Sequence, residues 1–332
     1  QTKHTSFPSE ESSFHLKLTQ IMAVFESLNT SALIRSHPDL GGCTTAQFQN
    51  GSCAKVIGGY DYVNNDPDPM DDHYHGTHVA GIVAANGLIK GVAPGASIVS
   101  LKVLNATGNG YVSSIASAID YCTTNAAALN ISIISMSLGI STLYPEPCTS
   151  GMGLSDEVDA AMAAGIEIVA SAGNDYNKSA LTLPACIPGV IATGSADKTD
   201  VIAASSDLAY YLSVLATGVS INSTAIGGGY QTLSGTSMAA PHVSGVLALL
   251  IADQLSETGT KPSHAQLLAA LQQNGVNITN PSNGSQSFSR INANASLWAL
   301  DHTAPRALSA YPANGSRTTG SAVQYAFNFS ET

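Results

Sequence analysis

Three short segments of this 332-residue chain hold residue types that can carry out nucleophilic catalysis. In the first, Ser237 lies among small residues in the sequence GTSMAAPH, residues 235–242, directly before a long apolar run. A serine at the first turn of a helix lies near unpaired N–H groups and the positive end of the helix dipole, which stabilise developing negative charge. The segment therefore predicts a nucleophile, although a lone serine here is more often an ordinary helix cap.

The other two segments supply partners for such a serine. His75 opens the sequence HGTHVAG, residues 75–81, and histidine is the usual general base for a serine. Asn174 follows the apolar run 166–170, and a side-chain amide at the end of a strand can donate to an oxyanion. Alone, each has a structural explanation, as a core histidine or as a turn residue after glycine. With Ser237 they predict acyl transfer.

The three segments together resemble those of the subtilisin-like serine peptidases, the subtilases, and the resemblance runs from about residue 37 to about residue 300. It implies that His75 is the general base, Ser237 the nucleophile and Asn174 the side chain of the oxyanion hole. His78 and His242 match structural histidines of the family. In the same alignment two edge segments would clamp an extended peptide between them. One edge is Ser137, Leu138 and Gly139, and the opposing edge is Gly108, Asn109 and Gly110.

The chain departs from the family at the third member of the triad. Subtilases carry an aspartate in an Asp-Thr-Gly segment, seven residues before the His-Pro-Asp-Leu found here at 37–40. In this chain the corresponding position is Thr30, and an alignment shifted by one residue places Asn29 there instead. No aspartate precedes Asp39. Loss of this carboxylate costs roughly four orders of magnitude in rate, as the subtilisin and chymotrypsin-type examples establish. The third triad member is therefore unassigned.

Glu26 is the one substitute in reach, because the sequence AVFES, residues 23–27, imitates an apolar strand followed by a carboxylate and a small hydroxyl. The spacing of the apolar residues favours a competing interpretation. Apolar residues recur at helical spacing at Leu18, Ile21, Met22, Phe25 and Leu28, which predicts an amphipathic helix instead.

The elements that must position these residues alternate between strand and helix. Short apolar runs predict buried parallel strands at Ser97–Leu104, Ile131–Leu138, Glu167–Ala170 and Val190–Ser195. Helices are expected at Val112–Asn125, Leu154–Ala164, through Val243–Ala252, and from Lys261 to Gln273 with Ser263 as the cap. This alternation predicts an α/β fold with a doubly wound, mostly parallel sheet flanked by helices. Ligands bind such sheets beyond the carboxyl ends of the strands, where Ser137 and Asn174 fall.

Three regions are expected along the chain. Residues 1–36 form an atypical or misjoined N-terminal segment, and residues 37–300 form the peptidase domain. Residues 301–332 are polar, with an apolar alternation at Ala322–Phe329, and form either a linker or the start of a truncated β domain.

Composition limits the partners. The net charge of −11 and a pI near 5.1 leave no basic patch for nucleic acid. No apolar run reaches membrane-spanning length, so we expect no membrane contact and a monomer that binds polypeptide substrates. Four aspartates before His75 allow a structural calcium site, but a solvated turn also explains them, and we expect no cofactor or metal. These are Asp66, Asp68, Asp71 and Asp72.

Five cysteines and eleven Asn-x-Ser/Thr sequons predict a secreted, glycosylated protein. Cys43 and Cys53 are the expected disulfide pair, and Cys122, Cys148 and Cys186 leave one thiol over. The sequence thus predicts a secreted serine endopeptidase that uses a Ser/His acyl-enzyme mechanism. The alternative, supported by the missing aspartate, is a catalytically dead glycoprotein of the same fold that binds peptides or partners.

Overall fold

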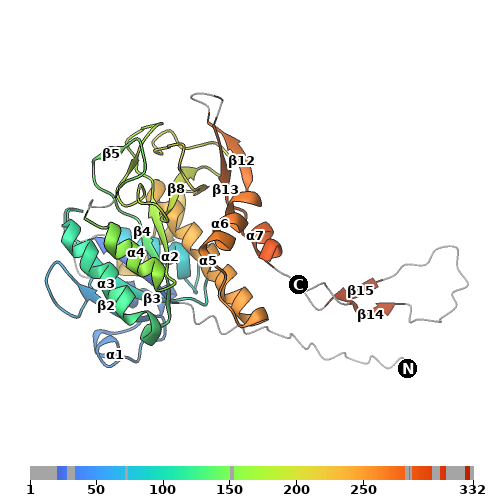
Figure 1. The fold of residues 1–332 in the computed structure, drawn as a ribbon. Helices are drawn as coiled ribbons and strands as arrows, with labels where there is room; N and C mark the ends of the chain where they lie inside the picture. The colour runs from blue at the N-terminus through green and yellow to red at the C-terminus, as the bar shows by residue number, and fades with distance from the viewer. Residues whose placement is uncertain are drawn as a thin grey trace, which may run out of the picture.

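A central nine-stranded sheet organises the molecule (Figure 1). The computed structural model describes residues 21–27, 34–71, 74–149, 153–280, 284, 286–300, 307–311 and 326–329. The strand order is β12 (Val276–Thr279), β13 (Ser287–Arg290), β9 (Val214–Thr217), β8 (Ile191–Ala196), β6 (Glu167–Ser171), β4 (Ile131–Met136), β1 (Ile21–Ser27), β3 (Ser97–Leu104) and β2 (Val56–Asp61). All neighbouring pairs are parallel except β12 and β13, so the predicted doubly wound α/β fold is confirmed.

Helices cover both faces of the sheet because its strands are apolar on both sides. On one face, α3 (Val112–Leu129) and α4 (Ser155–Ala163) pack against β3, β4 and β6. The other face packs against α2 (His75–Ala84), α5 (Thr236–Thr258), α6 (His264–Gln273) and α7 (Ala293–Leu300). Adjacent residues of β3 show the alternation, since Ile98 belongs to the second core and Val99 to the first.

Short elements complete the described chain. They are η1 (Ile34–Ser36), η2 (Pro38–Leu40), α1 (Thr45–Gln49), β5 (Leu143–Tyr144), β7 (Leu181–Thr182), β10 (Ile221–Thr224), η3 (Ile226–Gly228) and β11 (Tyr230–Leu233). Strands β14 (Ala307–Tyr311) and β15 (Ala326–Phe329) pair with each other in a separate two-stranded sheet. Ser263 caps α6 with the reciprocal bonds of a capping box, as predicted.

The helix expected around Ile21 and Phe25 is wrong. Residues 21–27 form β1, which lies between β3 and β4, with Phe25 opposite both Leu101 and Met136. A central slot between two parallel strands accepts any apolar run rich in Ile, Val and Phe, and pairing on both sides overrides the weaker helical periodicity. The sheet therefore includes seven residues that precede the expected start of the peptidase domain at His37.

Two disulfides join cysteines from neighbouring segments. Cys43 and Cys53 are bonded as predicted, with their Cα atoms 5.8 Å apart. The second bond joins Cys148 to Cys186, and the remaining thiol, Cys122, is buried on α3.

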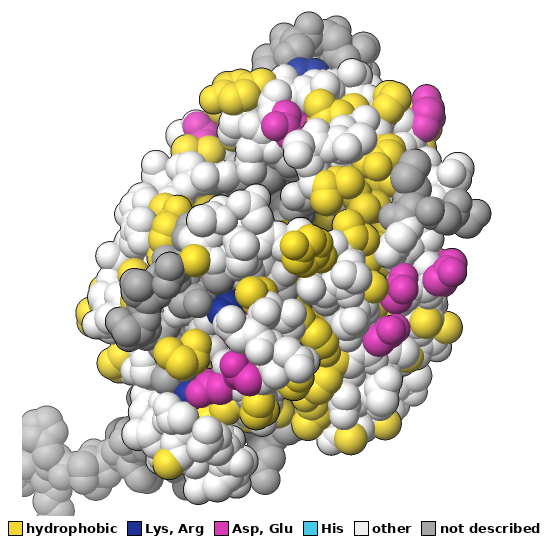
Figure 2. Space-filling view, turned by 90° about the vertical axis from the view of Figure 1, so that its left-hand side faces the viewer, with side chains coloured by type: hydrophobic (Ala, Val, Ile, Leu, Met, Phe, Trp, Pro, Cys, Tyr) yellow, Lys and Arg dark blue, Asp and Glu magenta, His cyan; other side chains and the backbone are white. Residues whose placement is uncertain are grey.

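The surface and the longest helix bear on possible partners. Figure 2 shows only a few Lys and Arg side chains on the face that it displays, and they form no basic patch there. Helix α5 is long and apolar enough to cross a membrane, a length that the sequence pattern did not predict. However, 78% of its most apolar window is buried inside the fold, so the core accounts for its composition.

Candidate active site

The fold presents Ser237 at the second position of α5. Gly235 precedes the helix at φ +152°, a region that favours glycine. Pro241 lies four residues after Ser237 and has no N–H to donate to the Ser237 carbonyl. The hydroxyl of Ser137, just beyond the end of β4, donates to that carbonyl oxygen instead at 2.8 Å. The first turn of α5 is therefore fixed to the edge segment that follows β4.

His75 is the first residue of α2 and is half-buried. Asp71 holds the start of this helix, because its Oδ2 accepts the N–H of Thr77 at 2.7 Å and also the Thr77 hydroxyl. His78, one turn further on, is fully buried, and its Nε2 lies 3.1 Å and 3.0 Å from the carbonyl oxygens of Ile221 and Gln231. Burial lowers the pKa of His78. The start of α2 is thereby joined to the β10–β11 hairpin.

A groove of about 390 Å³ joins the predicted base to both predicted edge segments. His75 lines it together with Ser137, Leu138 and Gly139 from one side and Gly108, Asn109 and Gly110 from the other. Gly110 has no room for a side chain, because a Cβ there would lie 2.3 Å from the carbonyl oxygen of Val103. The groove is therefore open between two backbone edges, the geometry that an extended chain requires.

Asn174 lies in the loop after β6 and contacts the residue next to the candidate nucleophile. Its Oδ1 accepts the N–H of Thr236 at 2.9 Å, and the Thr236 hydroxyl lies 3.2 Å away. Because this network assigns the oxygen to Thr236, the amide NH₂ is left as a donor. The structure thus places the three predicted chemical residues at one end of the sheet: Asn174 bonds to Thr236, the neighbour of Ser237, and His75 lines the same groove as Ser137, which bonds to the Ser237 carbonyl.

Asp207 holds the loop that contains Asn174 through hydrogen bonds to its backbone. The sequence analysis did not identify this residue. It is completely buried, and its Oδ1 accepts the N–H groups of Asp175 at 3.0 Å and Asn177 at 2.7 Å. Burial raises the pKa of Asp207, against these two hydrogen bonds, which lower it. No local pattern could have identified it, because its partners lie about thirty residues earlier in the chain.

Gly173 fits closely against this carboxylate. It has φ +118°, and a Cβ there would lie 2.2 Å from Oδ2 of Asp207. Both the conformation and the contact therefore require glycine directly before Asn174.

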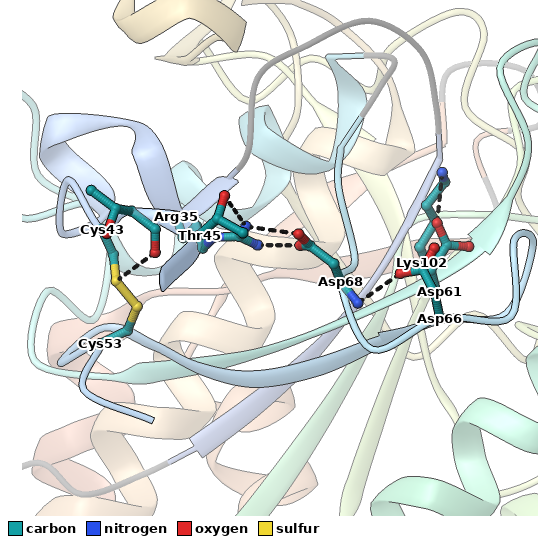
Figure 3. Close-up of polar contacts among 9 residues, drawn as sticks. Arg35, Cys43, Thr45, Cys53, Asp61, Asp66, Asp68 and Lys102 are labelled. Carbon is teal, nitrogen blue, oxygen red and sulfur yellow. Dashed lines mark hydrogen bonds and ion pairs between the residues drawn. A yellow bond between two sulfur atoms is a disulfide. The ribbon is translucent and has the colours of Figure 1, made fainter. Parts of the chain in front are cut away.

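Glu26, the candidate substitute for the missing aspartate, lies on the central strand β1. Glu26 is the penultimate residue of β1 and lies in register with Lys102 of β3, which in turn lies in register with Asp61 of β2. Lys102 is buried and forms an ion pair with Asp61 at 2.9 Å (Figure 3). Asn29 and Thr30 lie outside the described residues.

The aspartates before His75 serve structural contacts. Asp68 pairs with the buried Arg35 guanidinium at 2.5 Å and 3.1 Å (Figure 3), and Asp66 accepts the N–H of Asp68 at 2.7 Å. Asp71 caps α2 as described above, and Asp72 lies outside the described residues. Among the described parts of the chain, no group of three or more His, Cys, Asp or Glu side chains is arranged to hold a metal ion.

A doubly wound sheet with a serine, a histidine and an amide at the carboxyl ends of its strands defines a serine-hydrolase type of site. The Subtilase family model matches residues 28–284, so the chain belongs to the subtilase family.

The relatives agree with this family. A thermophilic serine proteinase of Bacillus sp. (strain AK1) is 40% identical over 245 residues, which are 68% of this chain and 55% of that protein. Subtilisin DY of Bacillus licheniformis is 41% identical over 204 residues, covering 59% of this chain and 70% of the relative. The chain thus spans little more than half the length of the first of these proteins. The crystal structure of a cold-adapted subtilisin-like serine proteinase matches with a TM-score of 0.65 and 29% identity, covering 82% of this chain and 88% of that one.

Proposed function

We propose that this chain is a secreted serine endopeptidase that hydrolyses peptide bonds through an acyl-enzyme. The groove shared by His75 and the two backbone edges carries the proposal, because it accommodates an extended polypeptide beside a general base. The proposed substrate is therefore a polypeptide. Two disulfides and eleven sequons support passage through an oxidising secretory route.

In this mechanism His75 removes the hydroxyl proton of Ser237 as its oxygen attacks the peptide carbonyl. The oxyanion is held by the amide of Asn174, which is available because its oxygen is engaged by Thr236. The N–H of Ser237 at the start of α5 is the second donor. His75 then protonates the leaving amine, and water releases the acid by the reverse path.

The test of the nucleophile is covalent labelling. Ser237→Ala should lose all labelling by a fluorophosphonate and all cleavage of denatured casein, while Ser256→Ala, an exposed serine near the other end of α5, should retain both. Labelling that persists in Ser237→Ala would show that the nucleophile is a different residue.

For the orienting carboxylate we propose Glu26, since β1 brings it to the carboxyl end of a central strand, the end at which Ser137 and Asn174 follow their own strands. Glu26→Gln should lower kcat by up to roughly four orders of magnitude, the effect of removing the triad carboxylate. Glu157→Gln on α4 is the matched control. If both variants retain full activity, Glu26 has no part in catalysis.

A peptide-binding protein without hydrolase activity is the second candidate. The absence of an aspartate before Asp39 favours it. It is the correct description if the purified wild-type chain neither reacts with the fluorophosphonate nor cleaves casein, yet binds peptides in the groove.

A further inference from the structure

One edge of the central sheet is open at β12. Among the described strands β12 pairs only with β13. Asn280, just beyond β12, donates to the carbonyl of Gln286 at 2.7 Å, and such bonds recur at every second residue of an antiparallel pair. The backbone N–H and C=O groups of Asn277 and Thr279 therefore point away from β13. An edge of this kind can pair with a foreign strand.

The sequence of β12 offers a modification site at this edge. Its four residues include no charged residue and no proline, which are common protections of an edge strand. They do include one of the eleven sequons, Asn277-Ile278-Thr279. Ile278 is buried in the core, whereas Asn277 and Thr279 are exposed on the opposite face of the strand. The acceptor amide and the hydroxyl of the sequon thus lie together at the open edge.

The side chain of Asn277 is free to carry an attached group, because it forms no hydrogen bond with any other residue in the part of the chain that the structure describes. Two other exposed sequons differ. Asn50 Oδ1 accepts the hydroxyl of Ser52 at 2.6 Å, and Asn105 Oδ1 accepts the hydroxyl of Thr107 at 2.8 Å. In those two sequons the asparagine side chain is held in a local turn.

Asn277 also lines a hollow of about 310 Å³, which lies between β13 and the segment before β9. This volume is at the lower end of the range for small-molecule sites, roughly 300 Å³. Hydroxyl groups, amides and one exposed tyrosine line the hollow, without a charged side chain in its described lining. They belong to Tyr210, Ser213, Gln272, Gln286, Ser287 and Ser289.

Such a lining suits a sugar, which carries hydroxyl groups around an uncharged ring with apolar C–H faces. Tyr210 is 61% exposed, and its ring lies 5.3 Å from that of Tyr211. The Tyr210 hydroxyl donates to Glu146 at 2.5 Å, so the ring is held at both ends. The amide of Gln272 donates to the carbonyl of Ser213 at 3.0 Å, which leaves the Gln272 side-chain oxygen as an acceptor.

We propose that Asn277 carries an N-linked oligosaccharide, whose first sugar, an N-acetylglucosamine, occupies this hollow and whose remainder covers the open edge of β12. The inference rests on the proposed passage through the secretory route. There Nδ2 of Asn277 attacks the anomeric carbon of an oligosaccharide carried on a lipid diphosphate. The new N–C bond forms as the C–O bond to the diphosphate breaks, Nδ2 loses one proton, and the lipid diphosphate leaves.

The first measurement maps the occupied sequons on protein secreted by a eukaryotic host that adds high-mannose chains. Peptide N-glycosidase F in heavy-oxygen water converts each glycosylated asparagine to a labelled aspartate, which mass spectrometry locates. We expect label at position 277 in the wild type and in Thr279→Ser, which keeps the sequon, and none in Thr279→Ala, which removes it. Label at other sequons but not at 277 overturns the proposal and leaves the secretory route standing. If no sequon is labelled, both fail.

The second measurement tests the hollow and the edge. Thr279→Ala and Asn277→Gln should each melt about 2–4 °C below the wild type, the shift that loss of a modest contact produces in a domain of this size. In sedimentation equilibrium they should self-associate about tenfold or more strongly, because the edge is uncovered. Trimming with endoglycosidase H, which leaves only the first sugar, should keep the melting temperature of the wild type but strengthen self-association.

Two variants control this measurement. Asn50→Gln removes an exposed sequon in the Cys43–Cys53 loop and should change neither property. In a Tyr210→Ala background, Thr279→Ala should cause no further fall in melting temperature, because the sugar has lost its aromatic contact. Equal melting and equal association in Thr279→Ala and Thr279→Ser would overturn the proposal, since the sugar would then neither fill the hollow nor cover the edge.

Discussion

Asp207 offers the sharpest test of how this fold positions Asn174, the proposed oxyanion donor. Its buried carboxylate accepts two backbone N–H groups of the loop that starts at Asn174, and its own N–H donates to the carbonyl of Gly173 at 3.0 Å. Its Oδ2 is buried without a hydrogen-bond partner among the described residues. Replacing Asp207 by Ala therefore removes the acceptor on which the loop depends and leaves both N–H groups unpaired.

The magnitude follows from these contacts. Two hydrogen bonds to a charged carboxylate contribute about 3–6 kcal/mol together, and removal of a carboxylate oxygen that lacks a partner returns about 1–3 kcal/mol. Asp207→Ala should therefore lower the free energy of unfolding by about 2 kcal/mol. Loss of a single oxyanion donor costs about 10²–10³ in kcat, a magnitude known from subtilisin itself. A loosened Asn174 should lower kcat by about 10–100-fold and leave KM within about twofold, because the donor acts on the transition state.

Two measurements check this prediction. Steady-state cleavage of a peptide substrate separates kcat from KM, and hydrogen exchange followed by mass spectrometry should show faster exchange at the amides of Asp175 and Asn177. Asp207→Asn, which keeps an acceptor oxygen, should retain kcat within about threefold. Leu271→Ala, at a fully buried position of α6, controls for general destabilisation of about 2–4 kcal/mol without contact to the loop.

Either of two results would refute the reasoning. One is a folded Asp207→Ala protein with unchanged kcat and unchanged exchange in the Asn174 loop. The other is an equal loss of kcat in Asp207→Asn and Asp207→Ala, which would mean that the acceptor oxygen is not what holds the loop.

Three further predictions concern stability. Replacing the Cys148–Cys186 pair by serines should cost about 4 kcal/mol in denaturant unfolding and the Cys43–Cys53 pair about 3 kcal/mol, because the two loops have separations of 38 and 10 residues. His264 lies 2.7 Å from the buried Glu167, and this hydrogen bond raises the pKa of the histidine. Its stabilisation is complete below pH 6.5 and is lost as pH rises through the raised pKa. The melting temperature of His264→Gln should thus fall below that of wild type at pH 5.5–6 and converge with it at alkaline pH, whereas a constant difference would contradict the pairing. Finally, the two carboxylate oxygens of Asp39 accept the N–H groups of Leu88 and Ile89, each at 3.0 Å, so backbone hydrogen bonds already engage the groups that could bind a cation there. We therefore expect chelation by EDTA to leave the melting temperature unchanged within about 1 °C. A larger drop would indicate a structural cation.

Much of the fold could be predicted because its buried strands are continuous apolar runs. The run Ser97–Leu104 coincides with β3, and α3 begins at Val112 as expected but continues to Leu129. Strand ends were less predictable, since β4 stops at Met136, two residues before the apolar run ends. Ser137 and Leu138 line the groove instead of continuing the strand, and hydrophobicity does not encode that change.

Residues outside continuous runs were harder to predict. β1 has a pattern that fits both periods, and its neighbours in the sheet decide between them. The motifs located His75, Ser237 and Asn174, because each is fixed by a few adjacent residues. The role of Asp207 depends on contacts between distant segments, so no local pattern indicates it.

The place of β1 has a consequence for how the chain acquires its fold. It is the first described strand to be synthesised, yet it lies between β3 and β4, which follow roughly seventy or more residues later. The sheet is complete only when β1 has paired with both β3 and β4, so β1 stays unpaired until these later strands have been synthesised. Pairing between segments so far apart in the sequence slows folding. Until then the exposed edges of β3 and β4 could each recruit a foreign strand. The chain is therefore vulnerable to aggregation before β1 has paired with β3 and β4. A factor that assists folding would act by protecting these strand edges.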